Sequence, residues 1–587
     1  MPGAEQPIGE FSRDYAPIWY FRPTKHCAQR LPSRYQSIPI LPMSTPTRRE
    51  SHSLESLGRG SLLYLVGQLV LIGATFGSRV LMVRSLSTSD YGDITLGLAT
   101  VAVITPLASL GIPYGIARQI AHSKDVYERH HLMVLAMALA TPLAIASGVA
   151  LFLAAPVMAT FVGTPAMTVV LRFASAYLAI SILSGTVGSI NQGEERMLPL
   201  TVFNMVVTPL LLLGFLVAFF STGASLSLAI LSYVLASAGG FLGISIYTFG
   251  SHWRKIRESL SAKNSEYGRR LLKDLLLFSA PLTMMGIATV VTGNVDALVL
   301  GFLGHPVGSV STTSIVGTYS AVITVSRLLT LGVASFAVIM LPVSARLHRA
   351  ENVGELGKSY ATMTKWILAI FFPLYTIFML VPGPTLLLIY GPVTQTSAFS
   401  DSATVLRITA TGAILTVLIG PAQSVLTGLG RLRLLFYDTV AAAAIDVFGS
   451  LLLVPSFGVY GAATAFALST AALPVFAVAQ TGILVRVHAV RQQVLAPLVV
   501  FIVASGLILG IAVYGFGWVP GTLSLVLLYF VLFFTYLGAI LLTRSTEIED
   551  LYLLGVFEKY LGRPIPILHR IVLRFEGKSS GEESPDE

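Results

Sequence analysis

The chain has 587 residues, of which 54% are hydrophobic and only 11% are charged. Because soluble domains carry about 25% charged residues, this composition excludes a large soluble enzyme and predicts an all-α integral membrane protein, whose helical crossings need about 20 apolar residues each. The formal net charge of +9 is concentrated in short loops between apolar runs, a distribution that indicates cytoplasmic loops rather than nucleic-acid binding.

The N-terminal segment differs from the rest of the chain. Residues 1–57 are rich in Pro, Ser and Arg, which predicts a disordered cytoplasmic tail because such a segment buries little apolar surface. They lack the continuous apolar region of a signal peptide. Met43 begins a stretch that leads smoothly into the first span and is an alternative start of translation. Cys27 is the only cysteine, so no intramolecular disulfide and no cysteine-based metal site are expected.

Fourteen apolar runs are long enough to cross a bilayer as helices. The first six lie in residues 58–250, at 61–83, 92–114, 132–155, 168–190, 197–220 and 224–250. The next six lie in residues 274–487, at 274–303, 314–343, 361–390, 402–427, 433–455 and 459–486. The last two lie in residues 488–543, at 494–515 and 520–543. Residues 251–273 form a basic cytoplasmic linker, and residues 544–587 are predicted to be a cytoplasmic amphipathic segment followed by a disordered tail.

Basic residues mark one side of the membrane. They gather in alternate loops, which include the loop after Arg118 and the linker 251–273, whereas the opposite loops carry Arg84 and almost no other basic residue. Loops rich in Lys and Arg stay in the cytoplasm. Since the number of spans is even, the pattern predicts a multi-pass protein of the cell (plasma) membrane with both termini in the cytoplasm.

Two parts of the chain repeat each other. Residues 170–196 match residues 405–431 at eight identical positions with a constant offset of 235, and Arg, Gly and Ser are among these positions. The offset corresponds to six spans, an even number, so both copies have the same orientation. The repeat predicts two pseudo-symmetric six-helix lobes followed by two extra C-terminal helices, an arrangement in which transporters hold substrate between rocking lobes. A duplication kept only for structure is the alternative.

Short segments carry Gly, Pro and Tyr in a characteristic order. They are V-R-S-L-S-T-S-D-Y-G at 83–92, which is similar to the pattern A-R-x-L-G-P-x-x-Y-G, then D-x-x-x-L-G at 296–301, V-G-x-Y at 316–319 and P-x-x-G-x-x-G-A-A-x-A at 455–465. Val83, Ser87 and Thr88 depart from the first of these patterns. With this order and spacing, residues 55–545 resemble the polysaccharide (O-unit type) and lipid-linked oligosaccharide flippases of the multidrug/oligosaccharidyl-lipid/polysaccharide exporter superfamily. Residues 326–342 are similar to the eighth helix of the related lipid II flippases.

This resemblance implies a flippase and not an enzyme. Such a protein moves polyprenyl-(pyro)phosphate-linked oligosaccharide from the cytoplasmic to the outer leaflet, by alternating access of two lobes, for polysaccharide or glycoprotein biosynthesis. The implied partners are the lipid-linked sugar, membrane lipids and the glycosyltransferases or polymerase of the same pathway, with no nucleic acid and no cofactor. The sugar, the lipid carrier, the coupling ion and the oligomeric state are left open.

Two arginines are candidates for binding the phosphate of such a substrate. Arg327 lies about 20 Å deep in the eighth span at 1.5 Å per residue, where a charge is costly and usually functional. Its planar guanidinium matches a phosphate in a way that Lys does not. The structural alternative pairs Arg327 with Asp296 or Asp446. Arg79 lies one turn from the outer end of the first span and either lines the cavity or extends to the membrane surface.

Other polar residues within the spans are candidates for binding the sugar or a coupling ion. Gln68, Asn204 and Asn294 are candidates for sugar contacts, although hydrogen bonds between helices explain them equally well. Asp296 and Asp446 are candidates for coupling to a cation or proton, and the alternative is again a pairing with Arg327. The sequence has no nucleotide-binding loop and no nucleophile elbow. We therefore expect no catalytic residue, no metal and no use of ATP.

Two other functions compete with flipping. A cation-coupled multidrug exporter of the same superfamily usually has twelve spans and often an acidic residue in the first span. Here the first span contains Arg79 and no acidic residue, and the chain has two more spans than such an exporter. A membrane polysaccharide polymerase or glycosyltransferase normally has large extracytoplasmic loops with catalytic residues. Here the corresponding loops are short and nearly uncharged.

Overall fold

The computed structural model describes residues 48–123, 125–250, 283–330, 343–349, 352–485, 491–512 and 521–546, with Met340 and Asp550. Contacts divide the chain into two units, Met1–Val66 and Gly67–Glu587. In the first unit the described part is the start of helix α2 (Arg48–Ser85). The linker 251–273, most of 544–587 and residues 1–47 of the predicted tail lie outside the described residues.

The start of α2 corrects one predicted boundary. The helix begins at Arg48, inside the segment 1–57 that the sequence predicts to be disordered. The stretch from Arg48 to Leu57 is polar, but it contains neither Pro nor Gly, so nothing in it stops the first span from extending backwards as a helix. All contacts described below lie within the second unit.

The described residues are almost entirely helical, and they contain no strand, only isolated bridge residues such as the pair Val307 and Val310. Eleven helices of this described part are long and apolar enough to cross a membrane, or twelve if the bent pair Thr283–Val291 and Val295–Leu303 counts as one span. The prediction of an all-α membrane protein is therefore confirmed. The predicted count of fourteen spans is not confirmed.

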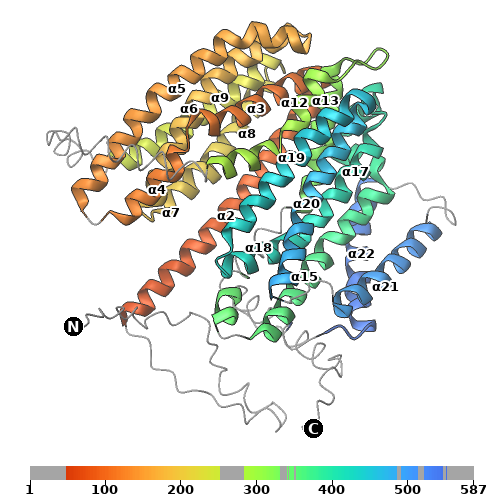
Figure 1. The fold of residues 1–587 in the computed structure, drawn as a ribbon. Coiled ribbons are helices and arrows are strands. Elements are labelled where there is room, and N and C mark those ends of the chain that lie inside the picture. The colour runs from red at the N-terminus through yellow and green to blue at the C-terminus, as the bar shows by residue number, and fades with distance from the viewer. Residues whose placement is uncertain are drawn as a thin grey trace, which may run out of the picture. The chain divides into compact units, whose positions relative to one another are not determined.

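The helices before the linker pack on one another. They are α3 (Thr88–Ala108), α4 (Ile112–His122), α5 (Val126–Val162), α6 (Ala166–Gly193), α7 (Met197–Leu200), a π-helical segment (Thr201–Val207), α8 (Thr208–Phe220) and α9 (Leu226–Gly250). Helix α6 is central, because it contacts α3, α4, α5 and α9. We call α2 to α9 the first helix group (Figure 1).

A second helix group follows the linker. It consists of α12 (Val295–Leu303), α13 (Thr312–Ser326), α15 (Val353–Leu380), α16 (Pro382–Tyr390), α17 (Ser402–Leu415), α18 (Ile419–Gly428), α19 (Leu432–Phe457) and α20 (Val459–Val485). Helix α20 contacts α12, α17, α18 and α19, while α21 (Gln492–Gly510) and α22 (Thr522–Leu542) pack on each other and on α15. The superposition of the two groups, expected from the repeat, stays a prediction.

Several predicted spans are broken helices. The seventh bends by 55° between Val291 and Val295. The eighth tightens into a 3-10 turn at Arg327–Thr330, and the ninth is interrupted just before Pro382, whose ring cannot continue the hydrogen-bond ladder. The tenth changes to a 3-10 turn at Thr416–Leu418. Such breaks free backbone groups that must find partners inside a membrane protein, and the first two lie beside the charged residues of the candidate site.

Candidate functional site

Helix α13 forms the main contact between the two helix groups. It begins at Ser311, whose hydroxyl caps the helix by accepting from the Ser314 amide at 3.2 Å. One face of the helix carries Thr313, Gly317 and Thr324, because Gly317 follows Thr313 by four residues and Thr324 follows Gly317 by seven. This face meets α3 of the first group.

The contact between α3 and α13 is backbone against backbone, and we call it the seam. A Cβ atom on Gly92 would overlap the Thr313 carbonyl oxygen, and one on Gly317 would overlap the Thr88 carbonyl oxygen. The Ser89 and Thr313 hydroxyl oxygens lie 2.7 Å apart and share a hydrogen bond across this contact. The two glycines, which the sequence offers only as family motif residues, therefore allow the helix groups to close on each other.

Arg79 crosses from the first helix group to the second. Its Nη1 donates to the Thr324 Oγ1 at 2.9 Å, so the guanidinium points toward α13 rather than to the membrane surface. Four tyrosines lie close enough to interact electrostatically with its guanidinium: Tyr91, Tyr177, Tyr233 and Tyr390. This placement favours a position inside the protein over the alternative that Arg79 extends to the surface.

Arg327 lies where two helix breaks meet. It occupies the end of α13, and its Nη2 donates to the Gly293 carbonyl at 2.6 Å, inside the bend of the seventh span. The guanidinium carbon lies 5.9 Å from the centre of the Phe466 ring, a cation–π distance. The ion pairs found among the described residues do not include Arg327. A direct lock on Asp296 or Asp446 is therefore absent from this described part, although both carboxylates are near enough to interact electrostatically.

The two acidic candidates differ in their surroundings. Asp296 lies in the first turn of α12, where the helix dipole favours an anion, and its Oδ2 accepts from the Tyr319 hydroxyl at 2.5 Å. Asp446 on α19 is fully buried, and neither of its carboxylate oxygens has a hydrogen-bond partner among the described residues. The nearby Ser469 hydroxyl is committed to the Phe466 carbonyl at 3.0 Å. Asp446 is thus a buried acid with the Ser469 hydroxyl close to its carboxylate.

The three predicted amides have different positions. Asn294 adjoins the carbonyl that binds Arg327, but its own amide donates back to the Val290 carbonyl at 2.8 Å. Asn204 lies in the π-helical segment and faces α6, where a Cβ on Gly188 would lie 3.4 Å from its Nδ2. Gln68 lies half-buried in α2. We call Arg79 and Arg327 with their immediate surroundings the arginine site. The structure thus places Asn294 beside the arginine site and Asn204 within the first helix group.

Solved structures of membrane transporters share this fold. The lipid II flippase MurJ in an inward closed conformation matches with a TM-score of 0.59 and 13% identity, covering 86% of this chain and 100% of that chain. An inward-facing multidrug resistance MATE family transporter of the MOP superfamily matches with a TM-score of 0.58 and 15% identity, covering 72% and 98%. A MOP superfamily transporter from Pyrococcus furiosus matches with a TM-score of 0.50 and 15% identity, covering 73% and 95%. No curated protein matches the sequence.

The sequence itself matches the family model of polysaccharide biosynthesis proteins over residues 57–348. Residues 57–348, almost half of the chain, are thus similar to this family. The matched part contains Arg79, Asp296 and Arg327, whereas Asp446 lies beyond it. The family and the fold agree with the resemblance found in the sequence motifs, and the chain is a multi-pass membrane protein with the fold of MOP superfamily transporters.

A buried ion pair, which the sequence analysis does not predict, involves α15 of the second helix group. The Lys365 Nζ lies 2.7 Å from the Asp550 Oδ2, and both side chains are 1% exposed. The same Nζ donates to the Ser545 carbonyl at 2.8 Å, and the Trp366 Nε1 donates to the Asp550 Oδ1 at 2.7 Å. The pair ties the chain after α22 to α15. Lys365 falls inside the predicted ninth span, and an intramembrane charge of this kind is a signal that the sequence did offer.

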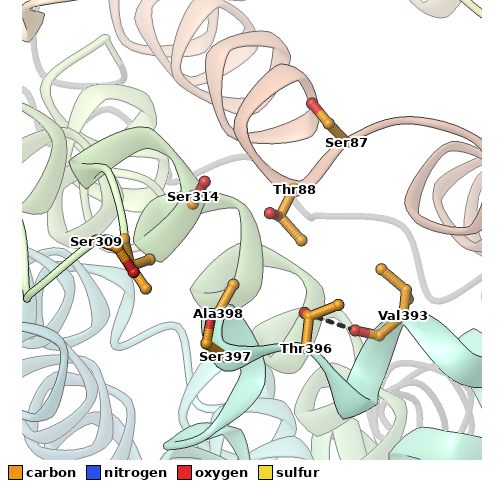
Figure 2. A pocket seen from close by; sticks show the side chains of 9 residues that line it. Ser87, Thr88, Ser309, Ser314, Val393, Thr396, Ser397 and Ala398 are labelled. Atoms are coloured by element: carbon orange, nitrogen blue, oxygen red, sulfur yellow. Dashed lines mark hydrogen bonds between the residues drawn. The ribbon is translucent and has the colours of Figure 1, made fainter.

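A pocket of about 330 Å³ lies beside the seam, at the N-terminal ends of α3 and α13 (Figure 2). Hydroxyl-bearing and small apolar residues line it, and they are Ser87, Thr88, Ser309, Val310, Ser314, Val393, Thr396, Ser397 and Ala398. Figure 2 shows that these residues come from the α2–α3 junction and from segments of the second helix group. Its lining contains no charged side chain, so the pocket differs from the arginine site in having only hydroxyl groups and apolar groups to offer a ligand.

Proposed function

We propose that the protein is a flippase that moves a polyprenyl-(pyro)phosphate-linked oligosaccharide from the cytoplasmic to the outer leaflet. The two helix groups would alternate in exposing the arginine site to the two sides of the membrane. The similarity of residues 57–348 to the polysaccharide biosynthesis family and the MOP transporter fold support this function. The glycosyltransferases or polymerase of the same pathway would be its partners, and the cell membrane its location, with both termini in the cytoplasm.

The observation that carries this proposal is the pair of interior guanidiniums. Arg79 donates to a threonine hydroxyl and Arg327 to a backbone carbonyl, so each has a neutral acceptor rather than a carboxylate. The two charges are close enough to repel each other. Placing two like charges inside a protein is costly, and a (pyro)phosphate that accepts from both would offset the cost by charge-assisted hydrogen bonds.

The two acids offer a means of coupling transport to an ion. Asp446 is fully buried without an ion-pair partner among the described residues, and Asp296 lies close enough to interact with it electrostatically. A buried carboxylate in such a position is stabilised by taking up a proton or a cation. Because Arg327 also interacts with both acids, the charge state of the acids would influence the arginine that meets the substrate. We propose this pair as the coupling site.

Deletion of the gene tests the proposed flippase function. The expected result is an accumulation of lipid-linked oligosaccharide on the cytoplasmic leaflet and the loss of the corresponding surface glycan, with unchanged sensitivity to toxic cations. Lipid extraction and surface glycan staining provide the measurement, and restoration of the gene is the control. Normal surface glycan would contradict the proposed function.

A multidrug exporter is the second candidate, because the MATE transporter matches the fold as well as the flippase does. It predicts the opposite pattern in the same cells, with normal glycan and increased sensitivity to cationic drugs. The charge of the site disfavours a multidrug exporter. The interior pair of Arg79 and Arg327 repels a cationic substrate and attracts an anionic one.

A further inference from the structure

The hydroxyl of Thr324 joins the two helix groups at a single point. It donates its proton to the Ser320 carbonyl of its own helix at 2.8 Å. A hydroxyl has one proton and two lone pairs, so the Thr324 oxygen meets Arg79 as an acceptor, at 2.9 Å from Nη1. Thr324 is 7% exposed, so water competes little for this contact. Its position is therefore fixed by one bond within the helix and one bond between the helix groups.

Thr324 is on the same face of α13 as the seam. Thr313 and Gly317 precede it by three turns and two turns, and they contact Ser89 and Thr88 of the first helix group. The bond from Arg79 to Thr324 continues this row of contacts toward the interior. Loss of that bond would leave the seam held only by its outer members.

The same guanidinium is the one that would meet an anionic substrate. A phosphate oxygen is charged and binds a guanidinium by two parallel hydrogen bonds, whereas Thr324 offers a single neutral acceptor. The Tyr91 hydroxyl, on a side chain that is 1% exposed, lies near both Arg79 and Thr324. A phosphate that replaces Thr324 as the acceptor of Arg79 would lie within reach of this hydroxyl as a second donor.

We propose that the hydrogen bond between Arg79 and Thr324 is a latch between the two helix groups, which an anionic substrate head opens by taking Arg79 away from Thr324. The proposal rests on the proposed function, because it needs an anionic head group at Arg79. Thr324 is a positioning residue that acts through Arg79. Binding of the substrate and loosening of the seam are then one event.

A disulfide across the seam measures the latch. In a chain with Cys27→Ser, the pair Ser89→Cys and Thr313→Cys replaces hydroxyls that lie 2.7 Å apart, so oxidation links the helix groups while the seam is closed. Thr324→Val keeps the shape of the side chain and removes the acceptor. We expect it to slow disulfide formation by about tenfold, since hydrogen bonds to charged groups have a net effect of this order.

Two control variants separate the latch from a general loss of packing. Thr324→Ser keeps the acceptor and should form the disulfide at the rate of the parent. Thr376→Val removes a threonine of similar exposure on α15, whose hydroxyl donates only to the Phe372 carbonyl at 2.9 Å, and should also leave the rate unchanged. Equal rates in Thr324→Val and the parent would overturn the proposal.

Farnesyl pyrophosphate, with farnesol as its uncharged match, tests the opening of the latch in lipid nanodiscs. In the parent, farnesyl pyrophosphate should slow disulfide formation and farnesol should not, whereas Thr324→Val should respond to neither. A parent that does not respond to farnesyl pyrophosphate, or a Thr324→Val variant that responds as the parent does, would overturn the coupling. Glycan export by cells is measured without these reagents, so the proposed function can stand if the latch fails.

Discussion

Arg327→Ala is expected to lower glycan export by about a hundredfold, a loss typical of removing one partner of a buried charged contact. The protein should remain in the membrane in its normal amount, because Arg327 is held by the Gly293 carbonyl and the Phe466 ring rather than by an ion pair. Arg327→Lys should also be impaired, since an ammonium replaces a planar fork by a point charge. Surface glycan and membrane protein level are measured together in cells that carry each variant.

Arg407→Ala is the matched control for this experiment. Arg407 is also an arginine within a predicted span that donates to a backbone carbonyl, that of Met379 at 2.9 Å, but its side chain is exposed. Its loss should therefore change export little. If Arg327 instead serves to balance the buried acids, Arg327→Ala should lower the amount of protein, and an added Asp446→Asn should restore it. Normal export by Arg327→Ala would end its assignment to the substrate.

Lys365→Ala is expected to destabilise the protein by about 3–5 kcal/mol, because it leaves the Asp550 carboxylate buried without its partner. The chain after α22 should then detach from α15, since the Ser545 carbonyl loses the same donor. Thermal unfolding in detergent and the amount of protein in the membrane provide the measurement. The effect should appear as reduced abundance of the protein, with normal export per molecule.

Two further variants show whether the ion pair itself is responsible. Replacing both partners, with Lys365→Met and Asp550→Leu, should recover part of the lost stability, because no unpaired charge is left. Arg196→Ala breaks the 3.5 Å pair with Glu194, in which Arg196 is 41% exposed, and should cost no more than about 1 kcal/mol. If Lys365→Ala and Arg196→Ala unfold at the same temperature, the buried pair has no special role.

The helical membrane fold could be predicted from the sequence because apolar length alone specifies a span. The bend at Gly293 could not, although Thr292, Gly293 and Asn294 interrupt the apolar run there, because glycine and polar residues also occur within unbroken membrane helices. The end of the tail was also misplaced: residues after Arg48 are polar, but polarity does not prevent a helix that the first span extends.

Arg79, Arg327, Asp296 and Asp446 could be identified because a charge within a span is rare and costly. Their partners could not be identified, because Thr324 is far from Arg79 in the sequence and only the fold brings the two side chains together. The fold likewise places Tyr91 near Arg79. The predicted pairing of Arg327 with an acid follows from charge alone, whereas the structure supplies a freed carbonyl that the sequence does not reveal.

The most direct measurement is flipping in vesicles that contain only this protein and lipid. A fluorescent polyprenyl-pyrophosphate oligosaccharide is placed in both leaflets, and a membrane-impermeant quencher is added outside. With the wild-type protein the quencher should eventually reach nearly all of the fluorescent lipid, whereas with Arg327→Ala it should reach only the share in the outer leaflet. An inner-leaflet share that stays protected in wild-type vesicles, with or without an ion gradient, would contradict the account.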